Sequence, residues 1–236
     1  MSAKCLDTYR PGGHQYSPLV LRLASGSPRR LELLTALGVR FEAVAPDIDE
    51  NAFAEPALAK AEAVAAPDGV TLAADTLVLV DGDVLGKPRD LDQAREMLHR
   101  LAGREHVVRT AVALLGVAGR RLRFAVRSRV WTKPADHERI EAFLATGEPL
   151  GKAGAYNIQG AGGALVARYD GCYANIVGLP LCHAYHALRR MGIVSERLPE
   201  AAFERLYGTR CPAAHCAAGQ GRSLRDGAEY DSWART

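Results

Sequence analysis

Serine and arginine side chains gather directly after an apolar run in the first part of the chain. Residues 19–24 read LVLRLA and predict a strand, and residues 25–30 read SGSPRR. A helix that begins at Pro28 would offer free backbone N–H groups and a dipole that favour an anion, and guanidinium groups match phosphate oxygens. Its candidate ligand groups are Ser25, Ser27, Arg29 and Arg30. The segment predicts a phosphate site, and a capped surface helix with two solvated arginines stays open.

An aspartate follows a second apolar run. Residues 70–74 read VTLAA and predict a strand that ends at Asp75, with Thr76 beside it. Ligand sites of α/β proteins open at such strand ends, and a carboxylate there can hold Mg²⁺ and orient a water molecule. Taken alone, the pattern favours an aspartate that closes a turn.

Further acidic and basic side chains lie on either side of this strand. Carboxylates of Asp47, Asp49 and Glu50 could join Asp75 at a metal, whereas a solvated acidic loop is the more common outcome. Lys60 and Lys87 are isolated lysines, and Lys87 occupies a turn, where a surface role is the usual expectation.

A glycine-rich segment at residues 151–160, GKAGAYNIQG, offers one more ligand group. Glycine lets a backbone approach a ligand closely, and the amide of Gln159 both donates and accepts, which suits the edge of a nucleobase. The alternative is a strand flanked by turns.

These residues must be positioned by alternating strands and helices. Pro28 and Gly38 mark the start and stop of the first helix. Hydrophobic periodicity and turn residues predict further strands at 40–45, 70–75, 76–80, 106–115 and 121–132, two short strands within 155–168, and helices at 56–66, 90–101, 134–146 and 179–191. The alternation predicts an α/β fold, and the adjacent strand pairs predict a mixed sheet.

Composition limits the classes of protein. The chain has 236 residues, of which 48% are hydrophobic and 24% charged, enough for a globular core. No apolar run approaches the roughly 20 residues of a membrane span, and the first residues lack the apolar region of a secretory signal, so we expect a cytoplasmic protein. The formal net charge of +3 and the isoelectric point near 8.6 do not indicate nucleic-acid binding. Five scattered cysteines without a CxxC motif predict reduced thiols.

The order of several short motifs is more specific than any one of them. They are LASGSPRR at 23–30, KA at 60–61, ADT at 74–76, GKP at 86–88, HVV at 106–108, TGEP at 146–149, KAGAY at 152–156, IQG at 158–160 and VGLPL at 177–181. This series resembles the Maf family of nucleotide pyrophosphatases over about residues 20–193.

The resemblance implies a fold and a reaction. Members of the family have a Maf/ITPase-like α/β fold, a mixed twisted sheet flanked by helices with two lobes around a central cleft. They hydrolyse nucleoside triphosphates to the monophosphate and pyrophosphate with a divalent metal, Mg²⁺ or Mn²⁺, and are usually homodimers. Arg29, Thr76 and Gln159 resemble the branch that prefers dTTP and UTP.

The resemblance also implies roles for individual residues. Asp75 is expected to activate water and to ligate the metal, together with Glu50 and Asp49. The expected substrate-binding residues are Ser25, Ser27, Arg29, Arg30, Lys60 and Lys87, and the expected specificity residues are Arg29, Thr76 and Gln159. We expect an N-terminal arm at 1–18, a Maf-like catalytic domain at 19–194, and a partly disordered tail at 195–236 with one helix near 200–207.

Two other functions stay open. The same fold could act on 7-methyl-GTP or on inosine-type purine triphosphates, which Arg29, Thr76 and Gln159 argue against. The chain could instead be a low-turnover nucleotide-binding regulator of septum formation, which the complete set of charged site residues argues against.

Overall fold

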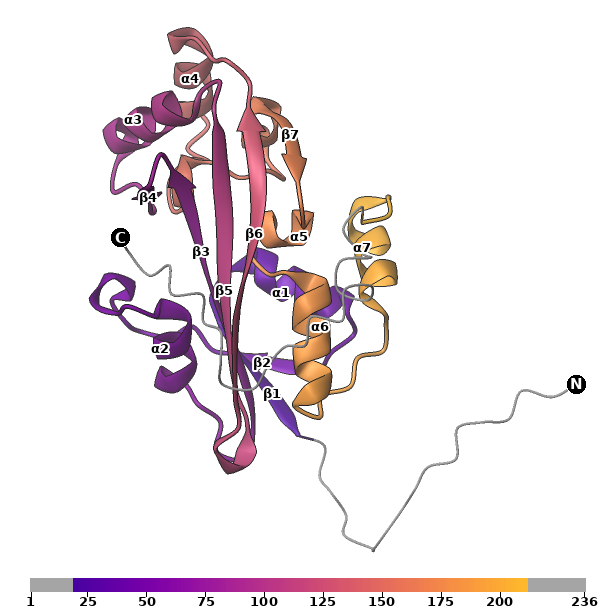
Figure 1. Cartoon of the computed structure of the whole chain (residues 1–236). Coiled ribbons are helices and arrows are strands. Elements are labelled where there is room, and N and C mark those ends of the chain that lie inside the picture. Colours follow the sequence, from indigo (N-terminus) through magenta and orange to yellow (C-terminus); the bar gives the residue numbers. More distant parts are fainter. Residues whose placement is uncertain (1–18, 212–236) are drawn as a thin grey trace, which may run out of the picture.

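One mixed seven-stranded sheet runs the length of the protein, shown here as a computed structural model whose described residues are 19–211 (Figure 1). Its strands are β1 (Val20–Ala24), β2 (Phe41–Ala43), β3 (Gly69–Val80), β4 (Asp83–Leu85), β5 (Glu105–Leu115), β6 (Arg121–Thr132) and β7 (Val166–Asp170). Their order is β2-β1-β3-β5-β6-β7, with β4 on β3. The predicted mixed α/β fold is confirmed.

The sheet changes character at β3. The strands β2, β1 and β3 are mutually parallel, whereas β3, β5, β6 and β7 pair antiparallel. The partnership of β1 with β3 ends at the pair Ala24 and Ala73, but β3 continues beside β5. Half of β3 therefore has no β1 alongside it, which leaves space for a ligand at the end of β1.

Helices flank the sheet, and local signals explain where several of them begin. They are α1 (Pro28–Ala36), α2 (Pro56–Ala63), α3 (Leu91–Leu101), α4 (His137–Leu144), α5 (Tyr173–Val177), α6 (Leu181–Arg190) and α7 (Pro199–Tyr207). Proline opens α1, as predicted, and Gly38 follows it with a φ of +69°. Asp90 and Asp136 cap α3 and α4 by accepting backbone N–H bonds. No helix within residues 19–211 is long and apolar enough to cross a membrane.

Two main hydrophobic clusters form the two lobes of the molecule. One contains Leu33 and Leu34 of α1, Leu188 of α6 and Phe203 of α7, and the other packs α3 and α4 against the far ends of β3, β5 and β6. Figure 1 shows the three long strands as a spine shared by both groups of helices. The two lobes were predicted, and they are joined by continuous strands rather than by a linker.

Two predicted strand pairs are wrong. The separate strands at 70–75 and 76–80 form the single strand β3, because the ladder with β5 continues without a break from Thr71 to Leu79. The two short strands within 155–168 are replaced by the 3₁₀ turns η3 (Ala153–Ala155) and η4 (Ala161–Leu165), followed by β7. Gly154 and Ala155 have φ values of +66° and +60°, which a strand does not accommodate.

The last part of the described chain also differs from the prediction. The helix expected at 179–191 begins at Leu181, and the short helix α5 precedes it, separated by Gly178 with a φ of +128°. The helix expected near 200–207 is confirmed as α7, which packs on α1 and α6. The arm at 1–18 and residues 212–236 of the tail lie outside the described residues, so both domain boundaries stay predictions.

A buried histidine in β5 predicts acid sensitivity of the fold. His106 is 2% exposed, and its Nε2 lies 2.7 Å from the hydroxyl of Tyr156. Burial lowers the pKa of His106 from 6.5 to about 4, so the unfolded chain binds the proton first as the pH falls. The contribution of His106 to stability is therefore present above about pH 6.5 and is lost as the pH falls from 6.5 to 4.

We expect this histidine to contribute about 1.5 kcal/mol of destabilisation between pH 6.5 and 5. Urea unfolding of the wild type and of His106→Gln at both pH values measures it, because glutamine keeps a polar partner for Tyr156 and does not titrate. An identical pH dependence in the two proteins would contradict the assignment.

Candidate active site

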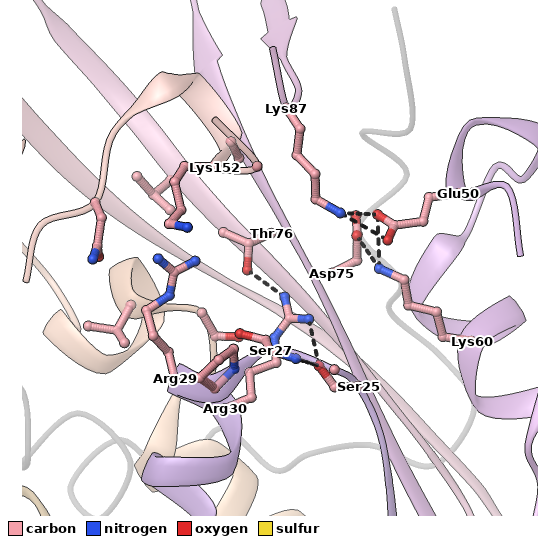
Figure 2. Close-up of a pocket in the computed structure, with 18 of the residues that line it drawn as sticks. Ser25, Ser27, Arg29, Arg30, Glu50, Lys60, Asp75, Thr76, Lys87 and Lys152 are labelled. Carbon is pink, nitrogen blue, oxygen red and sulfur yellow. Dashed lines mark hydrogen bonds and ion pairs between the residues drawn. The ribbon is translucent and has the colours of Figure 1, made fainter. Parts of the chain in front are cut away.

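A cavity of about 560 Å³ opens between the two lobes, at the point where β1 ends. It is lined by the loop at residues 24–30, by Asp75, Thr76 and Val78 of β3, by Lys87, and by residues within two segments, 151–157 and 176–178. Figure 2 shows cationic side chains entering it from several of these segments. The cavity brings together most of the residues that the sequence singled out.

The start of α1 forms one wall. Ser27 occupies the N-cap position, but its side chain makes no capping hydrogen bond, whereas its backbone N–H donates to Ser25 Oγ at 3.1 Å. Ser27 lines the cavity, and its hydroxyl is not used to cap its own helix. This arrangement suits an anion at the helix start.

Arg30 is held in place by three protein groups. Its Nε donates to the carbonyl of Gly178 at 2.9 Å, and its two terminal nitrogens donate to Ser25 Oγ at 3.3 Å and to Thr76 Oγ1 at 3.2 Å. Burial lowers the pKa of Arg30, while the charges of Asp75 and Glu50 raise it. Figure 2 shows the guanidinium between Thr76 and Ser25, with its hydrogen bonds to both as dashed lines.

Arg29 points into the same space and has a free donor. Its Nε is buried and has no hydrogen-bond partner within residues 19–211. Burial lowers its pKa, and the charge of Glu148 raises it. Such a donor is satisfied when a ligand accepts its hydrogen.

The opposite wall holds alternating charges. The ammonium of Lys60 lies 2.8 Å from Asp75 Oδ1 and 3.1 Å from Glu50 Oε2, and Lys87 Nζ lies 3.1 Å from Glu50 Oε1. Lys60 and Asp75 are 5% and 6% exposed, whereas Lys87 is exposed. Burial raises the pKa of Glu50, but the charge of Lys60 and the hydrogen bonds from both lysines outweigh this, so that the pKa lies below its usual value.

The sequence predicted that a strand ends at Asp75, and this prediction is wrong. The residue lies in the middle of β3, opposite Ala111 of β5, because β5 continues the ladder after β1 has ended. The carboxylate still faces an opening, since Asp75 lies two residues beyond Ala73, the last residue of β3 that pairs with β1.

Two predicted site residues lie apart from this cluster. Asp49 is exposed, and its carboxylate accepts the backbone N–H of Asn51 at 3.0 Å, which caps the 3₁₀ turn η1 (Glu50–Ala52). Gln159 is exposed, and its amide donates to the hydroxyl of Tyr207 at 3.4 Å, beyond the cavity lining. Within residues 19–211, no group of three or more histidine, cysteine or acidic side chains is arranged to hold a metal.

Two residues that the sequence left without a role act at or beside the cavity, and the charge of Glu148 acts on Arg29. Glu148 accepts the N–H groups of Ala161 and Gly162 at 2.8 and 3.2 Å and so holds the start of the turn η4. Lys152 lines the cavity, and Figure 2 shows it reaching toward Arg29 from the opposite side. The TGEP and KAGAY motifs carried both residues, but spacing alone did not assign them.

Comparisons with known proteins identify the family. The model of the family described as Maf-like protein matches residues 20–191. The chain belongs to the Maf family. A dTTP/UTP pyrophosphatase from Carboxydothermus hydrogenoformans is 46% identical over 181 residues, which cover 72% of this chain and 97% of that protein. One from Geotalea uraniireducens is 44% identical, covering 73% of this chain and 95% of that protein.

The likeness to solved structures covers only part of the chain. A HAM1 protein from Coxiella burnetii superposes with a TM-score of 0.35 at 20% identity, over 48% of this chain and 73% of that chain.

The two lysines on Glu50 differ in burial and form a matched pair of test sites in this Maf protein. Lys60→Met leaves two carboxylates without their buried counter-charge and should cost on the order of 3–5 kcal/mol at pH 7. Lys87→Met removes an exposed partner and should cost less than about 1 kcal/mol. Urea unfolding measures both, and equal losses would contradict the assigned difference in burial.

Proposed function

We propose that this protein hydrolyses nucleoside triphosphates, with dTTP and UTP preferred, to the nucleoside monophosphate and pyrophosphate, and so removes surplus or non-standard nucleotides from the pool. The observation that carries the proposal is the convergence of cationic side chains and two carboxylates in one cavity. A triphosphate needs the cations, and attack at phosphorus needs a base. The names of the relatives support the same reaction.

The residues divide the chemistry between the two walls. Asp75 Oδ1 is engaged by Lys60, and its second carboxylate oxygen takes a proton from the attacking water. The water oxygen bonds to the α-phosphorus, the bond from the α-phosphorus to the bridging oxygen breaks, and pyrophosphate leaves with that bond's electron pair. The developing charge is stabilised by Ser25, Ser27, Arg29, Arg30, Lys60 and Lys87.

We place the divalent cation at the same wall. Mg²⁺ is commonly held by one or two carboxylates together with substrate phosphates and waters, and Glu50 and Asp75 supply two carboxylates joined through Lys60. When bound, the cation, Mg²⁺ or Mn²⁺, supplies charge neutralisation to the phosphate oxygens. Asp49 joins this set only if the loop before η1 rearranges, because its carboxylate caps that turn.

Base selection is assigned to Arg29, Thr76 and Gln159. Arg29 and Thr76 line the cavity, and Thr76 bonds to Arg30. Gln159 would have to leave Tyr207 to reach a base. We further propose a cytoplasmic homodimer that acts on free nucleotides, a proposal supported by the family resemblance; sedimentation of the purified chain measures its assembly.

Pyrophosphate release from a panel of triphosphates tests the reaction. We expect selective turnover of dTTP and UTP over CTP, GTP, ITP and 7-methyl-GTP. Asp75→Asn should lower kcat by roughly 100-fold or more, because the water loses its base, while circular dichroism shows a folded protein, because Glu50 still pairs with Lys60. Turnover of a purine alone would overturn the assigned base preference, and a fully active Asp75→Asn would overturn the assigned base.

The dependence of activity on metal concentration tests whether Glu50 or its neighbour Asp49 binds the cation. Activity should vanish with excess EDTA and return with Mg²⁺ or Mn²⁺. Glu50→Gln should raise the Mg²⁺ concentration needed for half-maximal activity, whereas Asp49→Asn should leave it unchanged, because asparagine can also cap η1. A larger effect at Asp49 than at Glu50 would place the cation on the other side of the turn.

A further inference from the structure

A chain of hydrogen bonds leads from the cavity into the protein. Arg30 donates to Thr76 Oγ1 at 3.2 Å, and Thr76 Oγ1 lies 2.9 Å from Thr110 Oγ1. Thr110 Oγ1 lies in turn 3.0 Å from the backbone carbonyl of Asn175. Thr76 and Thr110 are directly opposite each other on β3 and β5, so their hydroxyls share one face of the sheet.

The hydrogen bond at the buried end of this series, from Thr110 to Asn175, has a fixed donor and acceptor. The Asn175 carbonyl is an acceptor, and it belongs to the C-terminal end of α5, where carbonyls lack helical partners. The N–H of Leu179, four residues further on, is bound to the carbonyl of Ala174 at 3.0 Å. Thr110 and Asn175 are both fully buried, at 0% exposure. The single hydroxyl hydrogen of Thr110 is therefore committed to Asn175.

This assignment fixes the donor and the acceptor in the next two hydrogen bonds toward the cavity. Because the Thr110 hydroxyl hydrogen is donated to Asn175, Thr76 must be the donor in the hydrogen bond between the two threonines. Arg30 has no acceptor, so Thr76 must accept from it. The Thr76 hydroxyl hydrogen thus points into the protein, and its oxygen has one lone pair left.

We infer that Thr110 is a specificity-determining positioning residue, because it makes the hydroxyl of Thr76 a fixed hydrogen-bond acceptor toward the substrate. An ionised phosphate oxygen carries no hydrogen and gains nothing from such an acceptor. The group that faces Thr76 is a donor of the nucleoside, either the N3–H of uracil or thymine or the 3′-hydroxyl of the sugar. Cytosine has an acceptor at N3. The inference rests on the proposed function, and an N3–H donor would add the reason for the preference of uracil and thymine over cytosine.

Three variants distinguish the effect of the Thr110 hydroxyl as a hydrogen-bond acceptor from the effect of side-chain packing. Thr110→Val keeps the side-chain shape but removes the acceptor, so that the Thr76 hydroxyl can rotate and donate. Thr110→Ser keeps the hydroxyl. Ser128→Ala loosens the same buried network elsewhere, because Ser128 Oγ accepts from the Asn175 side chain at 3.0 Å and does not touch Thr76.

Two ratios of kcat/KM are measured for each protein, UTP over CTP for the base and UTP over 3′-deoxy-UTP for the sugar. In the wild type, the ratio that reports the true donor is high. We expect that ratio to fall about tenfold in Thr110→Val, to return in Thr110→Ser and to be unchanged in Ser128→Ala. The ratio that falls identifies the donor.

Other outcomes overturn the inference and leave the proposed function standing. If the wild type turns over UTP and Thr110→Val lowers kcat/KM equally for all three substrates, Thr110 acts through packing alone. A fall in Ser128→Ala as large as that in Thr110→Val has the same meaning. A wild type that turns over neither UTP nor dTTP instead overturns the proposed function, and the inference with it.

Discussion

A buried ammonium between two carboxylates is the interaction on which the site depends. Lys60 comes from α2, Asp75 from β3 and Glu50 from the turn η1, so one cation ties together three segments that are distant in the sequence. Small side chains make this possible. A cluster of alanines that includes Ala57 and Ala61 of α2 packs against the sheet, which lets the helix approach closely enough for its lysine to reach β3.

The ion pair between Lys60 and the two carboxylates is accessible from the cavity because the sheet changes from parallel to antiparallel pairing at β3. Were β1 as long as β3, a neighbouring strand would cover the region around Asp75. Because β1 ends at Ala24 and the chain turns into α1, the start of a helix faces the carboxylates across the cavity. The anion-binding wall and the acidic wall thus both arise where β1 ends beside the continuing β3, and the long strands run through both lobes.

Local signals predicted the elements better than their boundaries. Proline at the start of α1 and Gly38 after it act within a few residues, so the sequence shows them directly. Asp75 resembled the end of a strand, because nothing local reveals that β5 continues alongside. The positions of Asp49 and Glu148 depend on which N–H groups their carboxylates meet, and tertiary packing decides that. The residue types therefore predicted the chemistry, whereas the groups that each side chain contacts could be identified only from the fold.

The way Arg30 is held has a consequence for binding thermodynamics. A free arginine loses much rotational freedom when it grips a ligand, and that entropy is subtracted from affinity. Here Gly178, Ser25 and Thr76 order the guanidinium during folding, and two of its five N–H groups keep no partner among the described residues. An arriving anion meets a group already in position, so its association should show a small entropic penalty at this side chain and a heat dominated by the new hydrogen bonds.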